Sequence, residues 1–172
     1  MNFPTRHSIR LPEYDYSEGG AYFITICVDG RVSPLGEVSG GEMRLNNLGR
    51  IADESWKWLE TKFPAIRVPS RCVMPNHMHA IILIDELAIT GRGGLQAARK
   101  PAWKKPLGHI IGAYKTHSTV EINDLLQTPG ARFWQRNYYE RVIRNEREFE
   151  ATHDYIVANP MNWEKDEYRA SQ

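Results

Sequence analysis

Short apolar runs and regularly spaced apolar positions alternate along the chain, and each kind of pattern predicts a different element. Runs rich in β-branched and aromatic residues predict core strands. Apolar residues that recur every three or four positions predict helices with one buried face. The predicted strands are residues 21–28, 66–74 and 77–84, with shorter strand material within 132–144, and the predicted helices are 47–62, 107–126 and 145–159.

The order of these elements predicts the fold class. Gly40 and Gly41 lie within 32–46 and predict a small hairpin. Without this hairpin and the Gly-, Pro- and Lys/Arg-rich loop at 86–106, the order is β-α-β-β-α-β. That order is typical of a ferredoxin-like α+β fold, which is an antiparallel sheet with helices packed on one face. Because no second core follows the loop, we expect residues 1–172 to form one domain.

Composition narrows the class of protein. The chain is 41% hydrophobic and 25% charged, as is usual for a globular domain. Its two cysteines, Cys27 and Cys72, lie far apart in apolar runs, which argues against a zinc or disulfide framework. No apolar stretch approaches the roughly 20 residues that span a membrane. The N-terminal residues lack the apolar core of a signal peptide. We therefore expect a cytoplasmic protein without a membrane partner.

Charge is concentrated in one part of the chain. The net charge of +1 argues against an indiscriminate nucleic-acid coat. Residues 86–145, however, contain ten basic and four acidic residues, so that segment carries +6. A local basic segment is compatible with contact to a polyanion. A solvated surface of a loop and a helix explains the same charge, and both explanations stay open.

The strand that begins HMH places two imidazoles together. Residues two apart on a strand point to the same face, so His77 and His79 project side by side while Met78 projects the other way. Two imidazoles on one face can chelate a divalent cation. Histidine pairs also occur on strands without a metal. Ile81 and Leu83 share the histidine face, so a helix is expected to cover it.

The last predicted helix carries a second pair of polar side chains. Tyr155 and Asn159 are one helical turn apart, about 6 Å on the helix surface. An amide oxygen is a suitable third ligand for a hard cation such as Mg²⁺ or Mn²⁺. Taken singly, Tyr155 is equally explained as a core tyrosine, and Asn159 as the last residue of a helix before Pro160.

Four stretches of the sequence resemble one family. They are LPEYDYSEGGAYFITICV, MPNHMHAIILI, FWQRNYYERVIRNEREFE and DYIVANP. HMH resembles the His-hydrophobe-His (HUH) motif of HUH nucleases, and DYIVANP resembles the tyrosine-bearing helix of the single-tyrosine transposases. The order and spacing of the stretches are most similar to the REP-associated tyrosine transposases. The resemblance covers nearly the whole chain.

The resemblance implies a fold, a reaction and a set of roles. It implies a ferredoxin-like fold that binds single-stranded or hairpin DNA, as a monomer or a homodimer. It implies Tyr155 as the nucleophile of a covalent 5′-phosphotyrosine intermediate. It also implies His77, His79 and Asn159 as ligands of Mg²⁺ or Mn²⁺. Tyr138 and Tyr139 are rival nucleophiles, but neither has an amide ligand one helical turn on.

DNA binding needs stacking surfaces and phosphate contacts. Aromatic and basic residues of the +6 segment are the candidates, and they are Trp134, Lys115, Arg136, Arg99, Lys100, Lys104 and Lys105. Two other functions remain open. One is a non-catalytic regulator, descended from such a transposase, that binds hairpin DNA. The other is a hydrolytic metalloenzyme that uses the histidine pair with water as the nucleophile.

Overall fold

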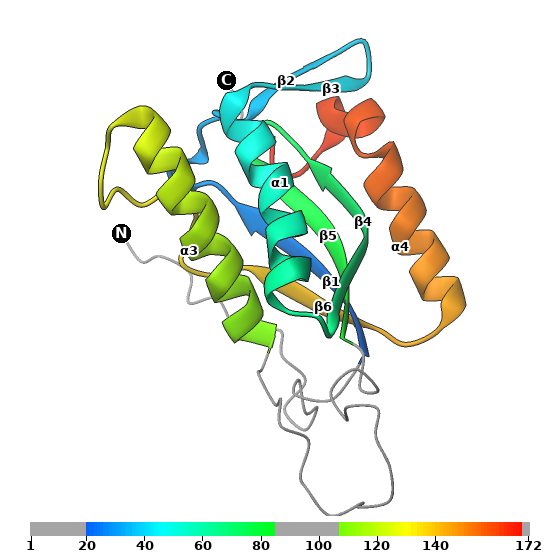
Figure 1. The fold of residues 1–172 in the computed structure, drawn as a ribbon. Coiled ribbons are helices and arrows are strands. Elements are labelled where there is room, and N and C mark those ends of the chain that lie inside the picture. The colour runs from blue at the N-terminus through cyan, green and yellow to red at the C-terminus, as the bar shows by residue number, and fades with distance from the viewer. Residues whose placement is uncertain (1–19, 85–106, 170–172) are drawn as a thin grey trace, which may run out of the picture.

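The computed structural model describes residues 20–84 and 107–169 (Figure 1). The elements are, in chain order, β1 (Gly20–Cys27), η1 (Asp29–Arg31), β2 (Gly36–Ser39), β3 (Glu42–Leu45), α1 (Asn47–Lys62), β4 (Ile66–Val73), β5 (His77–Ile84), α3 (Leu107–Leu126), β6 (Tyr139–Ile143), α4 (Glu146–Ala158) and η2 (Pro160–Lys165). None of the helices in these two ranges combines the length and the apolar composition that crossing a bilayer requires.

Four strands form one antiparallel sheet in the order β4-β5-β1-β6. This order, with α1 between β1 and β4 and α3 between β5 and β6, is the ferredoxin-like arrangement that the sequence predicted. The fold class is therefore confirmed. The β2–β3 hairpin forms a separate ribbon. Its turn uses Gly40 and Gly41 at φ angles of 62° and 79°, which glycine adopts without steric cost.

The two faces of the sheet are covered by different helices (Figure 1). α1 and α3 pack on one face, over a large core that includes Tyr22, Ile24 and Ile26 of β1. α4 covers the opposite face, where Phe23 and Ile156 belong to a smaller core. The sequence predicted helices on one face, and α4 adds cover on the other. Since β1 and β5 are apolar on both sides, each face needs a cover.

Asparagine side chains begin the first and last helices. The Asn46 side chain accepts hydrogen bonds from the backbone N–H groups of Leu48 and Gly49, at 2.9 and 3.1 Å. The Asn145 side chain accepts one from Glu148 N–H at 2.9 Å. These caps satisfy donors that the first helical turn leaves free. The start of α4 is thus determined locally, as the sequence predicted.

Candidate active site

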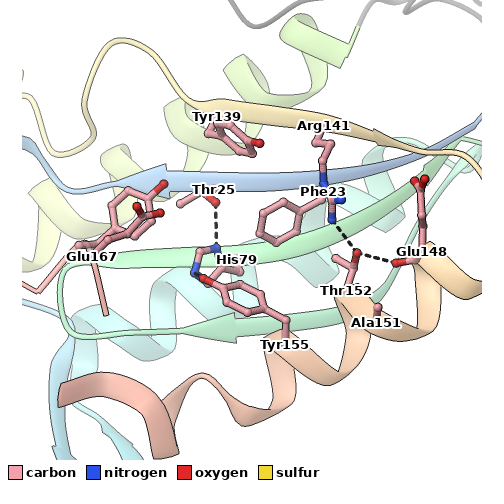
Figure 2. A pocket seen from close by; sticks show the side chains of 11 residues that line it. Phe23, Thr25, His79, Tyr139, Arg141, Glu148, Ala151, Thr152, Tyr155 and Glu167 are labelled. Atoms are coloured by element: carbon pink, nitrogen blue, oxygen red, sulfur yellow. Dashed lines mark hydrogen bonds between the residues drawn. The ribbon is translucent and has the colours of Figure 1, made fainter. Parts of the chain in front are cut away.

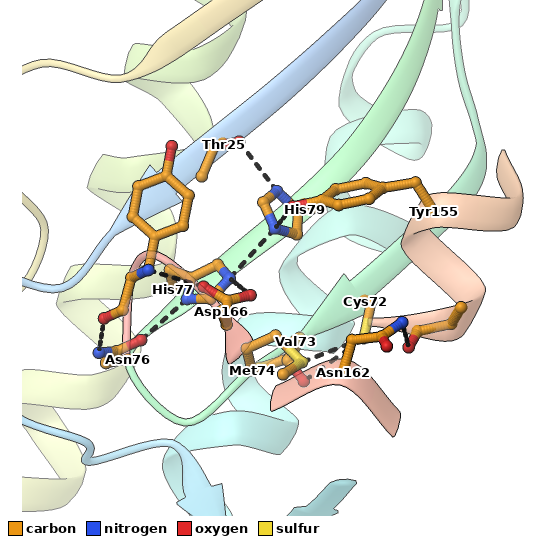
Figure 3. Close-up of polar contacts among 12 residues, drawn as sticks. Thr25, Cys72, Val73, Met74, Asn76, His77, His79, Tyr155, Asn162 and Asp166 are labelled. Carbon is orange, nitrogen blue, oxygen red and sulfur yellow. Dashed lines mark hydrogen bonds and ion pairs between the residues drawn. The ribbon is translucent and has the colours of Figure 1, made fainter. Parts of the chain in front are cut away.

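The two histidines of β5 lie side by side, with His79 next to Tyr155 of α4 and His77 next to Asp166 (Figure 3). His77 and His79 are both buried, with exposed fractions of 0% and 1%. Their Nε2 atoms are 3.1 Å apart. Both side chains project to the sheet face that carries Phe23 and Ile81. The strand geometry that the sequence predicted is therefore present, and the helix that covers this face is the one with Tyr155.

Neighbouring groups orient the two rings. The Asn76 amide nitrogen donates to the carbonyl oxygen of Tyr168 at 2.7 Å, so the Asn76 amide oxygen is the acceptor at His77 Nδ1, 2.8 Å away. His77 Nδ1 must then carry the proton, which leaves a lone pair on Nε2. His79 Nδ1 is hydrogen-bonded to Thr25 Oγ1 at 2.8 Å. Hydrogen bonds at the second ring nitrogen orient metal-binding histidines in this way.

Both imidazoles are neutral at physiological pH. Burial lowers the pKa of His77 to about 3. Burial, and then the neighbouring His77, lower the pKa of His79 well below its usual value. Two neutral rings whose Nε2 atoms meet at 3.1 Å form a suitable pair of ligands for a cation.

Tyr155 of α4 reaches the same place. Its phenol oxygen lies 3.4 Å from His79 Nε2, although the two residues are 76 positions apart in the chain. The side chain is 46% exposed, so it is accessible to a large substrate. Burial raises the pKa of Tyr155, the Asp166 carboxylate raises it further, and a hydrogen bond with the Asn159 side chain opposes both. The free phenol is therefore protonated at neutral pH.

Asn159, one turn after Tyr155, ends α4. It is 2% exposed, and its Oδ1 has no hydrogen-bond partner among the described residues. A buried acceptor without a partner is costly and uncommon. A bound hard cation would satisfy this oxygen, since amide oxygens coordinate such ions. The donor set of this site therefore fits a divalent metal.

Asp166 is a member of the site that the sequence reasoning missed. Its Oδ2 lies 3.8 Å from His77 Nε2, and its side chain is 4% exposed. Ligand atoms of His77, His79 and Asp166 all lie within 4.8 Å of one another. The η2 turn after Pro160 returns the chain to the histidines. No periodicity distinguishes Asp166 from its acidic neighbours Glu164 and Glu167, so no sequence signal selects it.

Two of the predicted DNA contacts have partners within the fold. Lys115 Nζ donates to the backbone carbonyls of Gln135, Arg136 and Asn137, at 3.0, 3.4 and 3.1 Å. Burial lowers its pKa to about 8. Trp134 is 3% exposed. Arg136 has an exposed side chain. Arg99, Lys100, Lys104 and Lys105 lie outside the described residues. A role in DNA binding stays a prediction for all seven.

Comparisons with known proteins agree with this picture of the fold. An uncharacterized protein of Haemophilus influenzae is 35% identical over 174 residues, which cover 94% of this chain and 92% of that protein. A REP-associated tyrosine transposase, solved bound to a REP hairpin, matches with a TM-score of 0.60 and 19% identity, over 95% of this chain and 74% of that chain. No family model matches the chain. The resemblance drawn from the sequence is confirmed at the level of the fold.

Proposed function

Since the chain belongs to the same family as the Haemophilus influenzae protein and has the fold of a REP-associated tyrosine transposase, we propose that it nicks and rejoins single-stranded DNA at hairpin sequences. The observation that carries this proposal is that Tyr155 of α4 meets His79 of β5, which is itself paired with His77. A nucleophile thus lies beside two neutral imidazoles and the Asp166 carboxylate, whose ligand atoms lie within 4.8 Å of one another. A nucleophile next to a metal site is suited to phosphodiester transfer.

Tyr155 is the proposed nucleophile. Its phenol oxygen forms a bond to the scissile phosphorus, and the bond from phosphorus to the 3′ oxygen breaks. The phenol proton leaves, and the departing 3′ oxygen takes up a proton to become a 3′-OH. The downstream strand is then held as a 5′-phosphotyrosine. A 3′-OH can reverse the step and rejoin strands, because the covalent link conserves the phosphodiester.

His77, His79, Asp166 and Asn159 are the proposed metal ligands. A divalent cation such as Mn²⁺ or Mg²⁺, held there, would offset the charge of the scissile phosphate and assist ionisation of the phenol. Thr25 and Asn76 hold the two imidazoles in the required orientation. The raised pKa of Tyr155 is the reason that such assistance is needed.

A covalent adduct is the decisive observation. We would incubate the protein with Mn²⁺ and a pool of DNA hairpins with randomised single-stranded flanks, labelled at the 3′ end because the downstream strand is retained. A denaturing gel is expected to show a protein–DNA adduct that Tyr155→Phe abolishes. Tyr138→Phe is the matched control, since that ring packs against the larger core on the other sheet face.

Each other outcome selects a different function. Cleavage without an adduct would favour the hydrolytic metalloenzyme. Tight binding of selected hairpins without cleavage would favour the regulator. An undiminished adduct in Tyr155→Phe would show that another residue is the nucleophile.

A further inference from the structure

A cavity of about 540 Å³ lies beside Tyr155 (Figure 2). It is bounded by side chains of β1, β5, β6 and α4 and by residues that follow η2. Its volume is within the range of small-ligand pockets. Because Tyr155 and His79 form part of its wall, whatever fills the cavity lies next to the proposed nucleophile.

The floor of the cavity is aromatic. Phe23 stacks on His79, with ring centroids 5.3 Å apart and planes at 24°. Tyr139 meets the Phe23 ring edge-on at 6.2 Å, and Tyr155 does so at 5.9 Å. Aromatic surfaces of this kind stack bases of single-stranded nucleic acids whatever their sequence.

The charges of the cavity argue against an anionic occupant. Glu148 and Glu167 contribute two carboxylates and Arg141 one guanidinium, so the formal charge of the wall is −1 with His79 neutral. A negative wall disfavours a phosphate. Arg141 is held in place, because it donates to Thr152 Oγ1 at 2.9 Å and lies 5.8 Å from the centre of the Phe23 ring. A guanidinium has five N–H donors, so others can face a base edge.

We propose that this cavity holds one unstacked base of the DNA strand, that of a nucleotide next to the phosphate attacked by Tyr155. The inference rests on the proposed function and adds a determinant of specificity to it. The partly exposed Tyr139 provides the stacking surface, with the buried Phe23 ring behind it, and Arg141 contacts the edge of the base. A base within a duplex cannot enter without leaving its stack. The cavity therefore selects single-stranded DNA at the cleavage point.

The test removes one base at a time. The hairpin most enriched in the adduct pool is remade with an abasic site at each of three positions on either side of the cleavage point. An abasic site at one position next to the cleaved phosphate is expected to lower the rate of adduct formation about tenfold, which is the effect of losing one stacked base.

Variants of the cavity connect that loss to the protein. Tyr139→Leu and Arg141→Gln are expected to lower the rate of adduct formation with the intact hairpin. Adding the critical abasic site is expected to lower their rates little further, because the base and the side chain contribute through one contact. Tyr139→Phe keeps the ring and is expected to behave as wild type. Arg147→Gln, an exposed arginine on α4 outside the cavity, is the matched control. Thermal melting checks that every variant is folded.

The outcomes separate the inference from the proposed function. If the abasic site and Tyr139→Leu act independently, so that their fold-changes in the rate of adduct formation multiply, the cavity does not hold a base. The same follows if no abasic position changes the rate. A Tyr155-dependent adduct would persist in that case, and the proposed function would stand. If no adduct forms with any hairpin, the proposed function fails and this inference fails with it.

Discussion

At the scale of single residues, the environment of His77 shows why its neighbours matter as much as the histidine itself. The Asn76 amide directs its proton to Nδ1, and the free Nε2 then faces both His79 Nε2 and the Asp166 carboxylate. Burial raises the pKa of Asp166, whereas hydrogen bonds with the Tyr168 backbone and the Asn159 side chain oppose this. A cation at this point would join the Asp166 carboxylate to the lone pair on His77 Nε2.

Asp166→Asn is expected to weaken Mn²⁺ binding by about tenfold or more, since even supporting groups of metal sites contribute on that order. Titration calorimetry with Mn²⁺ alone measures this without any DNA. Asp154→Asn, which changes an exposed acid on α4, is the control and is expected to bind as wild type does. Equal affinities for wild type and Asp166→Asn would remove Asp166 from the site.

At the scale of elements, α4 places the nucleophile through signals at both of its ends. Asn145 caps the first turn, and the Glu148 carboxylate accepts the Arg144 N–H at 3.0 Å. Pro160 follows the last turn. Between these ends, Ile156 is fully buried in the smaller core, whereas Tyr155 turns partly to solvent. Local signals thus determine where α4 begins and ends, whereas packing of Ile156 determines how the helix is rotated about its axis.

Asn145→Ala is expected to lower the free energy of unfolding by about 1 kcal/mol, the usual effect of losing an N-cap. Urea denaturation followed by circular dichroism measures the change. Asn46→Ala, which removes the cap of α1, offers a matched comparison because its side chain accepts two backbone hydrogen bonds. A midpoint for Asn145→Ala equal to that of wild type would show that the Asn145 cap does not support α4.

The elements could be predicted closely because their signals are local. The predicted strand at 66–74 is observed as Ile66–Val73, and the predicted helix at 107–126 is observed as Leu107–Leu126. Within that helix, apolar spacing predicts Val120 on the buried stripe, but its side chain is 50% exposed. Ser118 lies on the buried side instead. Its hydroxyl donates to Tyr114 O and accepts from Trp134 Nε1, both at 2.8 Å, which makes its burial favourable.

At the scale of the whole molecule, charge distribution should control how the protein meets DNA. The chain carries only +1, but the segment at 86–145 carries +6 and includes the exposed Arg136. Each phosphate that a cation neutralises releases counterions, so affinity falls as salt rises. A protein with this charge pattern is expected to bind hairpin DNA through that segment and not through its entire surface.

Arg136→Gln is expected to make the plot of log affinity against log salt shallower by about 0.7 to 0.9, the contribution of one phosphate contact. Fluorescence anisotropy with a labelled hairpin from the adduct pool, at several salt concentrations, measures the slope. Lys62→Gln changes an exposed cation at the end of α1, outside the +6 segment, and is expected to leave the slope unchanged. An unchanged slope for Arg136→Gln would place that arginine away from the DNA.

The sequence by itself determined which side chains of a single strand or helix lie on the same face of that element. A period of two on β5 aligns His77 with His79, and one helical turn on α4 aligns Tyr155 with Asn159. Only the tertiary structure decided that α4 lies on the histidine face and that Asp166 joins the site. The physical reason is that backbone geometry orients side chains along an element, whereas distances between elements depend on how remote side chains pack. The cavity beside Tyr155 arises in the same way, from elements that meet only in the folded chain.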